Sequence, residues 1–125
     1  MLPVHRLTPE QTVHLGMLVM PHLEPKGFLH AQTNPSQADD RDATVAHALR
    51  LAKLYEAFGL PKSRVCIKIP STVAGLGACA VLEKDHGVRT LATTCFCLEQ
   101  GLAAAEAGCL YVAPYVNPLC LSFFL

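Results

Sequence analysis

Strand-like and helix-like segments alternate along this chain, and that alternation restricts the fold more than any other feature of the sequence. Strands are predicted at residues 27–33, 65–69, 88–93 and 110–113. Helices are predicted at about residues 8–20, 43–58, 73–85 and 98–107. Strands of about five residues that alternate with helices of about ten to sixteen form right-handed βαβ units on a parallel sheet. The chain is therefore predicted to be an α/β protein.

Two architectures fit this order, a (β/α)8 barrel and an open doubly wound sheet. A doubly wound nucleotide-binding sheet carries Gly-x-Gly-x-x-Gly after its first strand. No such motif follows residues 27–33, and Gly75-Leu76-Gly77 lies inside or at the start of a helix with no P-loop lysine after it. The barrel is thus favoured, while the open sheet stays an alternative.

Local signals mark several boundaries of these elements. Thr8-Pro9-Glu10-Gln11 is typical of a capping box with proline at the first helical position. Gly59 and Gly108 stand where helices end, as glycine often does. Residues 34–42 are polar and acidic with a proline, so we expect a loop there.

Composition disfavours several functional classes. Formal net charge is zero, so we expect no nucleic-acid or anionic-membrane partner, which a basic patch would attract. No apolar stretch reaches the roughly 20 residues of a membrane helix. Six cysteines lie in the chain, namely Cys66, Cys79, Cys95, Cys97, Cys109 and Cys120. Most lie in apolar segments, and the first twelve residues are unlike a secretory signal, so we expect free thiols in the cytoplasm.

We expect no metal site and no cofactor. Cys95-Phe96-Cys97 lacks the second pair of ligands that a structural zinc site needs. The six histidines are scattered without a His-x-x-x-His spacing.

Lys68 is the most unusual residue of the predicted strands. It lies in Val65-Cys66-Ile67-Lys68-Ile69, a run that is otherwise β-branched and apolar. Burial disfavours the charged form of an amine, and a neutral amine attacks carbonyls to form a Schiff base. The alternative is that Lys68 lies near the strand end and extends its amine to water.

Polar residues follow each predicted strand, where active sites of parallel α/β folds collect. The four strand ends offer, in order, Gln32, Thr33 and Asn34; Lys68, Ser71 and Thr72; Thr93 and Thr94; and Tyr115 and Asn117. One amine among hydroxyls and amides suits carbonyl and polyol chemistry. A serine hydrolase is disfavoured, because the only nearby histidine is His30, two residues before Gln32. As alternatives, Ser71 and Thr72 could cap the next helix, and Thr93 could be bonded to backbone.

Several segments taken together resemble the transaldolase family, most closely its fungal transaldolase-like branch. They are Arg-Val-Cys-Ile-Lys-Ile-Pro-Ser-Thr at residues 64–72, Leu-Glu-Lys-Asp-His-Gly-Val-Arg-Thr-Leu-Ala-Thr-Thr at 82–94, Gln100 with Ala-Ala-Glu-Ala-Gly at 104–108, and Tyr-Val-Ala-Pro-Tyr-Val-Asn at 111–117. The resemblance implies a (β/α)8 barrel that transfers a dihydroxyacetone unit between sugar phosphates, in carbohydrate metabolism of the pentose phosphate type. It implies no cofactor, and it places the family's Schiff-base lysine on Lys68.

At the remaining site positions, the chain keeps some of the family's residue types and lacks others. The family's acid/base glutamate falls on Gln32, and an amide cannot shuttle protons as a carboxylate does. A substrate-binding asparagine falls on Leu91, whereas the threonine two residues later is kept as Thr93. The chain also has Ala113 where the family has a serine, Tyr115 where it has a phenylalanine, and Pro118 where it has a phosphate-binding arginine.

From the strand-end positions and the family resemblance, we expect Lys68, Gln32 and Thr93 in catalytic positions. We expect the substrate to be bound by Asn34, Ser71, Tyr115 and Asn117.

Counted against the family, residues 1–118 supply strands three to six of a barrel, and residues 119–125 form a tail unlike the family. A sheet of about four strands cannot close a barrel that normally takes about 250 residues. We therefore expect a partial barrel, which a second copy could complete as a homodimer. A truncated, non-catalytic product and a half-barrel interaction module are the alternative functions.

Overall fold

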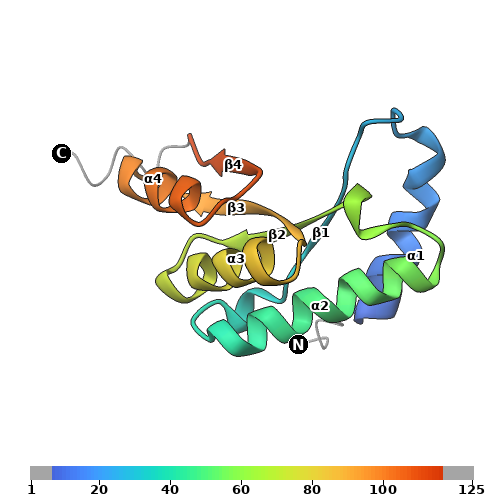
Figure 1. The fold of residues 1–125 in the computed structure, drawn as a ribbon, viewed down its shortest axis with the longest axis horizontal. Helices are drawn as coiled ribbons and strands as arrows, with labels where there is room; N and C mark the ends of the chain where they lie inside the picture. The colour runs from blue at the N-terminus through green and yellow to red at the C-terminus, as the bar shows by residue number, and fades with distance from the viewer. Residues whose placement is uncertain (1–6, 117–125) are drawn as a thin grey trace, which may run out of the picture.

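Four parallel strands form one sheet in the computed structural model, which describes residues 7–116. They are β1 (Leu29–Gln32), β2 (Val65–Pro70), β3 (Arg89–Cys95) and β4 (Tyr111–Pro114). Their order across the sheet is the order along the chain, β1-β2-β3-β4 (Figure 1). A doubly wound sheet reverses its strand order at a switch point, whereas a barrel does not. The described residues are therefore a segment of the barrel type, and the open-sheet alternative is wrong.

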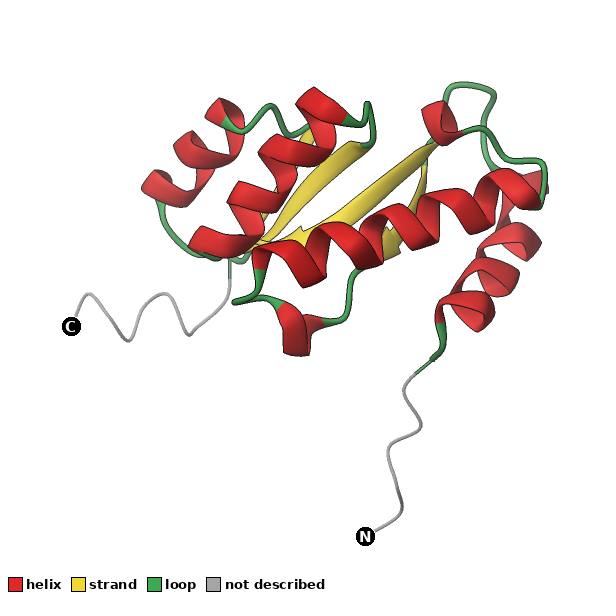
Figure 2. Cartoon of the chain, turned by 60° about the horizontal axis from the view of Figure 1, so that its bottom comes forward, coloured by secondary structure: helices red, strands yellow, loops and turns green. Residues whose placement is uncertain are grey.

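The helices lie on one side of this sheet (Figure 2). They are α1 (Pro9–Val19), α2 (Arg41–Ala57), α3 (Val73–Asp85) and α4 (Leu98–Glu106), with short 3₁₀ turns at Met20–His22, Pro35–Gln37 and Lys62–Arg64. Thr8 Oγ1 accepts from Gln11 N–H at 3.2 Å, and Gln11 Oε1 accepts from Thr8 N–H at 2.9 Å. The predicted capping box and the predicted order of elements are both confirmed. No helix in residues 7–116 has both the length and the apolar character that crossing a bilayer requires.

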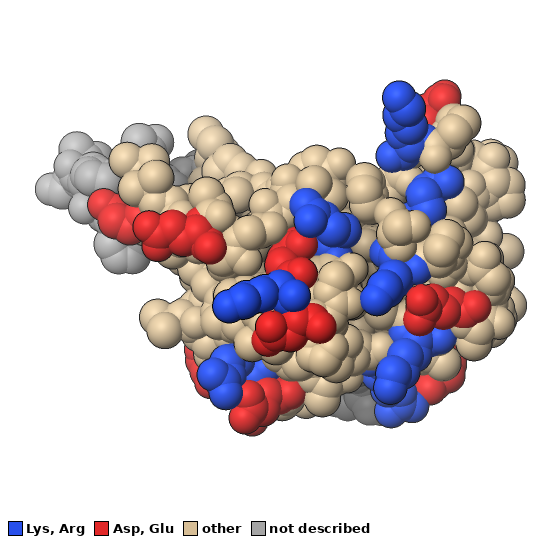
Figure 3. Space-filling model, in the orientation of Figure 1, with Lys and Arg blue, Asp and Glu red and all other residues tan. Residues whose placement is uncertain are grey.

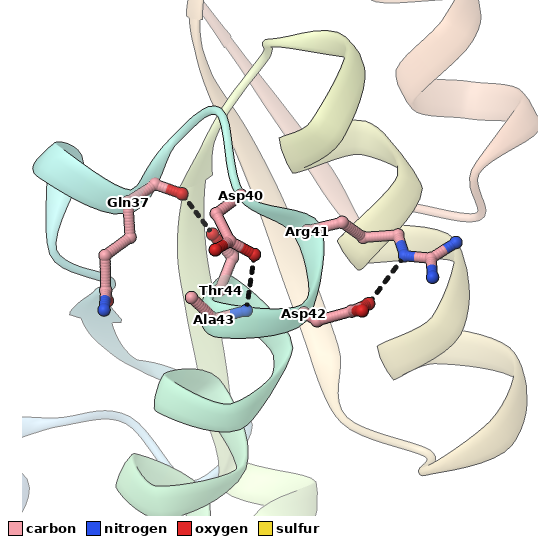
Figure 4. A network of polar contacts seen from close by, with 6 residues as sticks. All are labelled: Gln37, Asp40, Arg41, Asp42, Ala43 and Thr44. Atoms are coloured by element: carbon pink, nitrogen blue, oxygen red, sulfur yellow. Dashed lines mark hydrogen bonds and ion pairs between the residues drawn. The ribbon is translucent and has the colours of Figure 1, made fainter.

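The start of α2 differs from the prediction by two residues. Asp40 accepts from Ala43 N–H at 2.9 Å and so caps the helix before Arg41 (Figure 4). Thr44 Oγ1 donates to Gln37 O at 2.9 Å and fixes the preceding turn against the helix. Within the predicted loop, Pro35–Gln37 is a 3₁₀ turn rather than irregular chain. Side-chain capping, which the apolar periodicity does not report, explains the shift.

The strand boundaries also move by one or two residues. Strand β3 runs on to Cys95, past the predicted end at residue 93, through an irregularity in its pairing with β4. Thr94 lies at that irregularity with φ of 53°, a conformation uncommon for a threonine. The carboxyl end of β3 is therefore bent, next to the positions predicted to bind substrate.

The hydrophobic core lies between the sheet and its helices. Val65, Ile67 and Ile69 of β2 are fully buried in it. They pack with residues of the helices, among them Ala48, Leu51, Tyr55, Cys79 and Leu82. Residues at alternate positions share a face of a strand, so β2 gives these three side chains to the helices.

The unit formed by α4 and β4 is covered less well. Leu98 and Leu102 on α4 are 73% and 57% exposed, and Val112 on β4 is 40% exposed. Acidic and basic side chains are interspersed on the face of the molecule shown in Figure 3. Exposed apolar side chains also lie on α1, at Leu15, Leu18 and Val19, so the apolar exposure is not confined to this end of the described residues.

Candidate active site

Lys68 lies on the face of the sheet opposite to the helices. Its neighbours Ile67 and Ile69 belong to the helix-side core, so the alternation of the strand places Lys68 on the other, concave face. The other five residues of β2 are buried, while Lys68 is half-buried. Within β2, then, the amine is the one group that can meet a molecule from solvent.

Gln32 lies beside Lys68 in the sheet. The two residues are paired across β1 and β2, and Lys68 is paired in turn with Leu91 of β3. Side chains in register on parallel strands share a face, so Gln32, Lys68 and Leu91 form a row on the concave face. Gln32 is exposed and Leu91 is 8% exposed. The backbone at Lys68 is held in place because Lys68 O accepts from Thr33 N–H at 3.1 Å.

Thr93 lies two residues beyond Leu91 on the same face of β3. Its side chain is fully buried, and Thr93 Oγ1 makes no hydrogen bond within the part of the chain that the structure describes. The alternative of a threonine hydroxyl bonded to backbone is therefore wrong for these residues. Buried hydroxyls in proteins are normally bonded, so an orphaned one marks a place where a partner from outside would be favourable.

Ser71 and Thr72 both have structural bonds. Ser71 is buried, and its Oγ donates to Thr93 O at 2.8 Å, which ties the end of β2 to β3. Thr72 Oγ1 accepts from Gly75 N–H at 2.9 Å and caps α3. The capping alternative is confirmed for Thr72 and wrong for Ser71. As a substrate-binding residue, Ser71 stays a prediction, and its hydroxyl hydrogen is already engaged.

Asn34 lies in the turn after β1. Its Oδ1 accepts from Ser36 N–H at 3.1 Å, and its own N–H donates to His47 Nδ1 at 3.0 Å. Burial and the charge of Arg50 lower the pKa of His47, which keeps this nitrogen an acceptor. Asn34 and Gln32 line a cleft of about 890 Å³ between α1 and α2, whose lining does not include Lys68. Asn34 is thus beside a cleft that the amine of Lys68 does not line.

Of the two substrate-binding residues predicted after β4, Tyr115 is among the described residues and Asn117 is not. Tyr115 packs edge-on against Phe96, with ring centroids 5.3 Å apart, and its N–H donates to Cys95 O at 2.8 Å. Asn117 and Pro118 lie outside the described residues, as does the predicted tail at 119–125. Tyr115 is therefore near the end of β3, and the assignment of Asn117 stays a prediction.

Three features of the site were not anticipated from the sequence. Gln100 Nε2 donates to Ser71 O at 2.9 Å, and Gln100 Oε1 accepts from Phe96 N–H at 2.7 Å, so α4 braces both strand ends. The strained Thr94 lies at the same place. Tyr111 of β4 reaches across the concave face to His30 of β1, with ring centroids 5.7 Å apart. The only sequence signal for the His30–Tyr111 contact was that His30 lies two residues before Gln32, on the same face of the predicted strand.

In the described residues, no three His, Cys, Asp or Glu side chains are arranged to hold a metal ion. The five cysteines among these residues are free thiols.

Comparison with known proteins gives one consistent result. A family model described as transaldolase/fructose-6-phosphate aldolase matches residues 3–120. Over 91 residues the chain is 48% identical to the transaldolase of Kluyveromyces lactis, 44% identical to transaldolase NQM1 of Saccharomyces cerevisiae and 43% identical to the transaldolase of Homo sapiens. Each alignment covers 73% of this chain and 27% of the relative, so the chain spans about a quarter of their length.

Proposed function

The chain belongs to the transaldolase/fructose-6-phosphate aldolase family, and on that premise we propose that Lys68 forms a Schiff base with a ketose in a transaldolase-type transfer. Barrels are the fold of this family, so the four parallel strands are part of a (β/α)8 barrel. The unit transferred between sugar phosphates would be dihydroxyacetone. We place this activity in the carbohydrate metabolism of the cytoplasm, of the pentose phosphate type.

One observation carries the proposal, namely the placement of Lys68. A half-buried amine lies in the middle of the sheet, in register with Gln32 and on the same face as the orphaned hydroxyl of Thr93. Sugars offer a carbonyl to the amine and hydroxyls to the groups around it. The amine of Lys68 would attack the ketone carbon, and the carbonyl oxygen would leave as water.

The neighbouring groups would orient the ketose. The exposed amide of Gln32 can both donate and accept a hydrogen bond to a sugar hydroxyl. Thr93 Oγ1 would gain in a substrate hydroxyl the partner that it lacks. Asn34, Ser71, Tyr115 and Asn117 are proposed to bind the substrate around these two, with no cofactor or metal taking part.

The test is reductive trapping of the Schiff base. Borohydride added with dihydroxyacetone or fructose 6-phosphate should leave a stable adduct on Lys68, found by peptide mass spectrometry. Lys68→Met should remove the adduct completely. Lys53→Met, which changes an exposed lysine on α2, should leave it unchanged. No adduct on the unmodified chain, or an adduct that survives Lys68→Met, would contradict the proposal.

A second candidate is a non-catalytic half-barrel, either a truncated product or a module that docks on another chain. The exposed Leu98, Leu102 and Val112 of the last βα unit favour it, because exposed apolar side chains that lie together are typical of interaction surfaces. Self-association would instead let two copies complete one barrel. Light scattering after size exclusion distinguishes the two. A homodimer that traps dihydroxyacetone supports the enzyme, and a monomer with no adduct supports the module.

A further inference from the structure

The concave face needs a proton acceptor that Gln32 cannot supply. Gln32 is the residue in register with Lys68, and its amide neither takes up nor releases a proton near neutral pH. Removal of a proton from the carbon next to an iminium requires such an acceptor. Another side chain on the same face must therefore take the proton, or solvent must.

One row toward the amino ends of the strands, three residues with ionisable side chains are in register. His30 is paired with Cys66, and Cys66 is paired with Arg89. Cys66 is fully buried, and burial raises the pKa of its thiol to about 12. Arg89 is a permanent cation and donates to Glu83 Oε2 at 3.0 Å. Of this row, only an imidazole can accept a proton near pH 7.

His30 lies beside the site on the same face of the sheet. It lies on the strand next to Lys68, on the same face and two positions before Gln32. Tyr111 comes across from β4 and packs on the imidazole at 5.7 Å with a 34° tilt, while Phe28 packs edge-on against the same tyrosine at 6.1 Å. Tyr111 is itself in register with Leu91, in the row of Lys68, and His30 is the basic member of these three packed rings.

We propose that His30 is the proton acceptor for carbonyl chemistry at Lys68, on the face where Gln32 cannot act. The proposal rests on the Schiff-base function proposed above. It adds to the site a residue that neither the family assignment nor the lysine motif points to.

Condensation forms a carbon–nitrogen bond between the neutral Lys68 Nζ and the ketone carbon, takes up one proton from water, releases the ketone oxygen as water, and leaves a cationic iminium. A proton then leaves the adjacent hydroxymethyl carbon, and its C–H electron pair becomes the C=C bond of a neutral enamine. That proton goes to the imidazole of His30, which becomes imidazolium. Return of the proton from His30 to carbon reverses the step, so no oxidant or reductant is used.

The electrostatics favour this role. Burial and the nearby charge of Lys68 lower the pKa of His30, so the imidazole is neutral and able to accept at pH 7. Lys68, Cys66 and Tyr111 are the titratable groups beside it on the other strands, whereas the guanidinium of Arg89 is held by Glu83 of α3. A positive charge on Lys68 disfavours protonation of the neighbouring imidazole. Replacing Lys68 by a neutral side chain should therefore raise the pKa of His30.

Two readouts on the full chain test the proposal, with dihydroxyacetone as the probe. Borohydride trapping reports the Schiff base, and exchange of the hydroxymethyl protons into deuterated water, followed by NMR, reports proton removal. In His30→Asn and His30→Gln we expect trapping within about twofold of the unmodified chain. Exchange should fall about 100-fold or more, the size of a general-base contribution. His22→Asn, which changes an exposed histidine outside the sheet, should alter neither readout.

The pH profile excludes a purely structural role. Exchange by the unmodified chain should decline as pH falls, with an inflection below 6.5 that His30→Asn removes. An NMR titration should show a higher pKa of His30 in Lys68→Met than in the unmodified chain. Adduct formation with exchange unchanged in His30→Asn overturns the proposal and leaves the Schiff base standing. No adduct on the unmodified chain overturns both.

Discussion

The two faces of β2 differ in almost every physical respect, although they alternate residue by residue along one short strand. Toward the helices, Val65, Ile67 and Ile69 are fully buried in the apolar core. Toward the concave side, Lys68 is half-buried beside an exposed amide. One face holds the fold together, and the other offers groups that can react. The difference shows that stability and chemistry can be separated here at adjacent positions.

The carboxyl-end rim of the sheet joins these two faces. Ser71, Thr72 and Gly75 follow β2 and attach it to β3 and α3. His47 attaches α2 to the end of β1 through Asn34. Substitutions at the rim should therefore lower the free energy of unfolding by less than those in the core and by more than those on the concave face.

The largest effect should come from truncating the core face of β2. Ile67→Ala removes buried methyl groups next to Leu51 and Tyr55, and such changes lower the free energy of unfolding by about 2–5 kcal/mol. Lys68→Met, one residue later, should change it by no more than about 1 kcal/mol, because the side chain is half-buried and keeps its length. Urea denaturation followed by circular dichroism measures both. Similar losses in the two variants would show that the faces are not energetically distinct.

The rim provides the next effect, through Gly75. A Cβ on Gly75 would lie inside van der Waals contact of the Pro70 carbonyl oxygen, which is backbone and cannot swing away. Gly75→Ala should therefore lower the free energy of unfolding by about 1–3 kcal/mol, as overpacking does. It should also weaken trapping at Lys68, because α3 would shift against the end of β2.

Gly77→Ala is the matched control for this prediction. A Cβ there meets only the flexible side chain of Arg41, at 3.4 Å, and alanine favours the helix by up to about 1 kcal/mol. Gly77→Ala should be neutral or stabilising in the same urea titration. An equal loss in the free energy of unfolding for both variants would show that the close approach of Gly75 to the Pro70 carbonyl does not hold α3 in place.

Much of the fold follows from local features of the sequence, because those features act over a few residues. The capping box at Thr8 and Gln11 is a short-range arrangement, and it is present as predicted. The apolar run around Lys68 predicted that this residue lies on a strand inside the sheet. The register of β1 and β2 then pairs Gln32 with it. Helix starts set by side-chain caps, such as that of Asp40, fell two residues away from the apolar periodicity.

The parts of the site that could not be predicted depend on contacts between residues far apart in the chain. Tyr111 meets His30 only because the sheet curves enough to bring β4 over β1. Gln100 bonds Ser71 across 29 residues, and nothing in its local sequence distinguishes it from an ordinary helix residue. Thr94 adopts a positive φ where β3 bends, although threonine disfavours that conformation. Curvature and bracing of this kind are properties of the assembled sheet.

A smaller effect should follow from the cap of α3. Thr72→Ala removes the acceptor for Gly75 N–H and also the bond from Thr72 Oγ1 to Ala38 O, so the free energy of unfolding should fall by about 0.5–2 kcal/mol. Thr72→Ser keeps the hydroxyl and should recover most of that loss. Thermal unfolding of the two variants side by side is the measurement. Equal destabilisation of both would assign the effect to the methyl group and its packing.

The smallest effect should be a pH dependence at the other end of the rim. His47 has a lowered pKa in the folded chain, from burial and from Arg50, so the unfolded chain binds its proton more readily. Stability should therefore be lost as pH falls below 6.5, where protonation also ends the bond from Asn34 N–H. His47→Gln should flatten the change in thermal midpoint between pH 7.5 and pH 5.5, with His30 supplying what remains. A midpoint that rises on acidification would reverse the sign and show that His47 gains, rather than loses, a favourable partner when protonated.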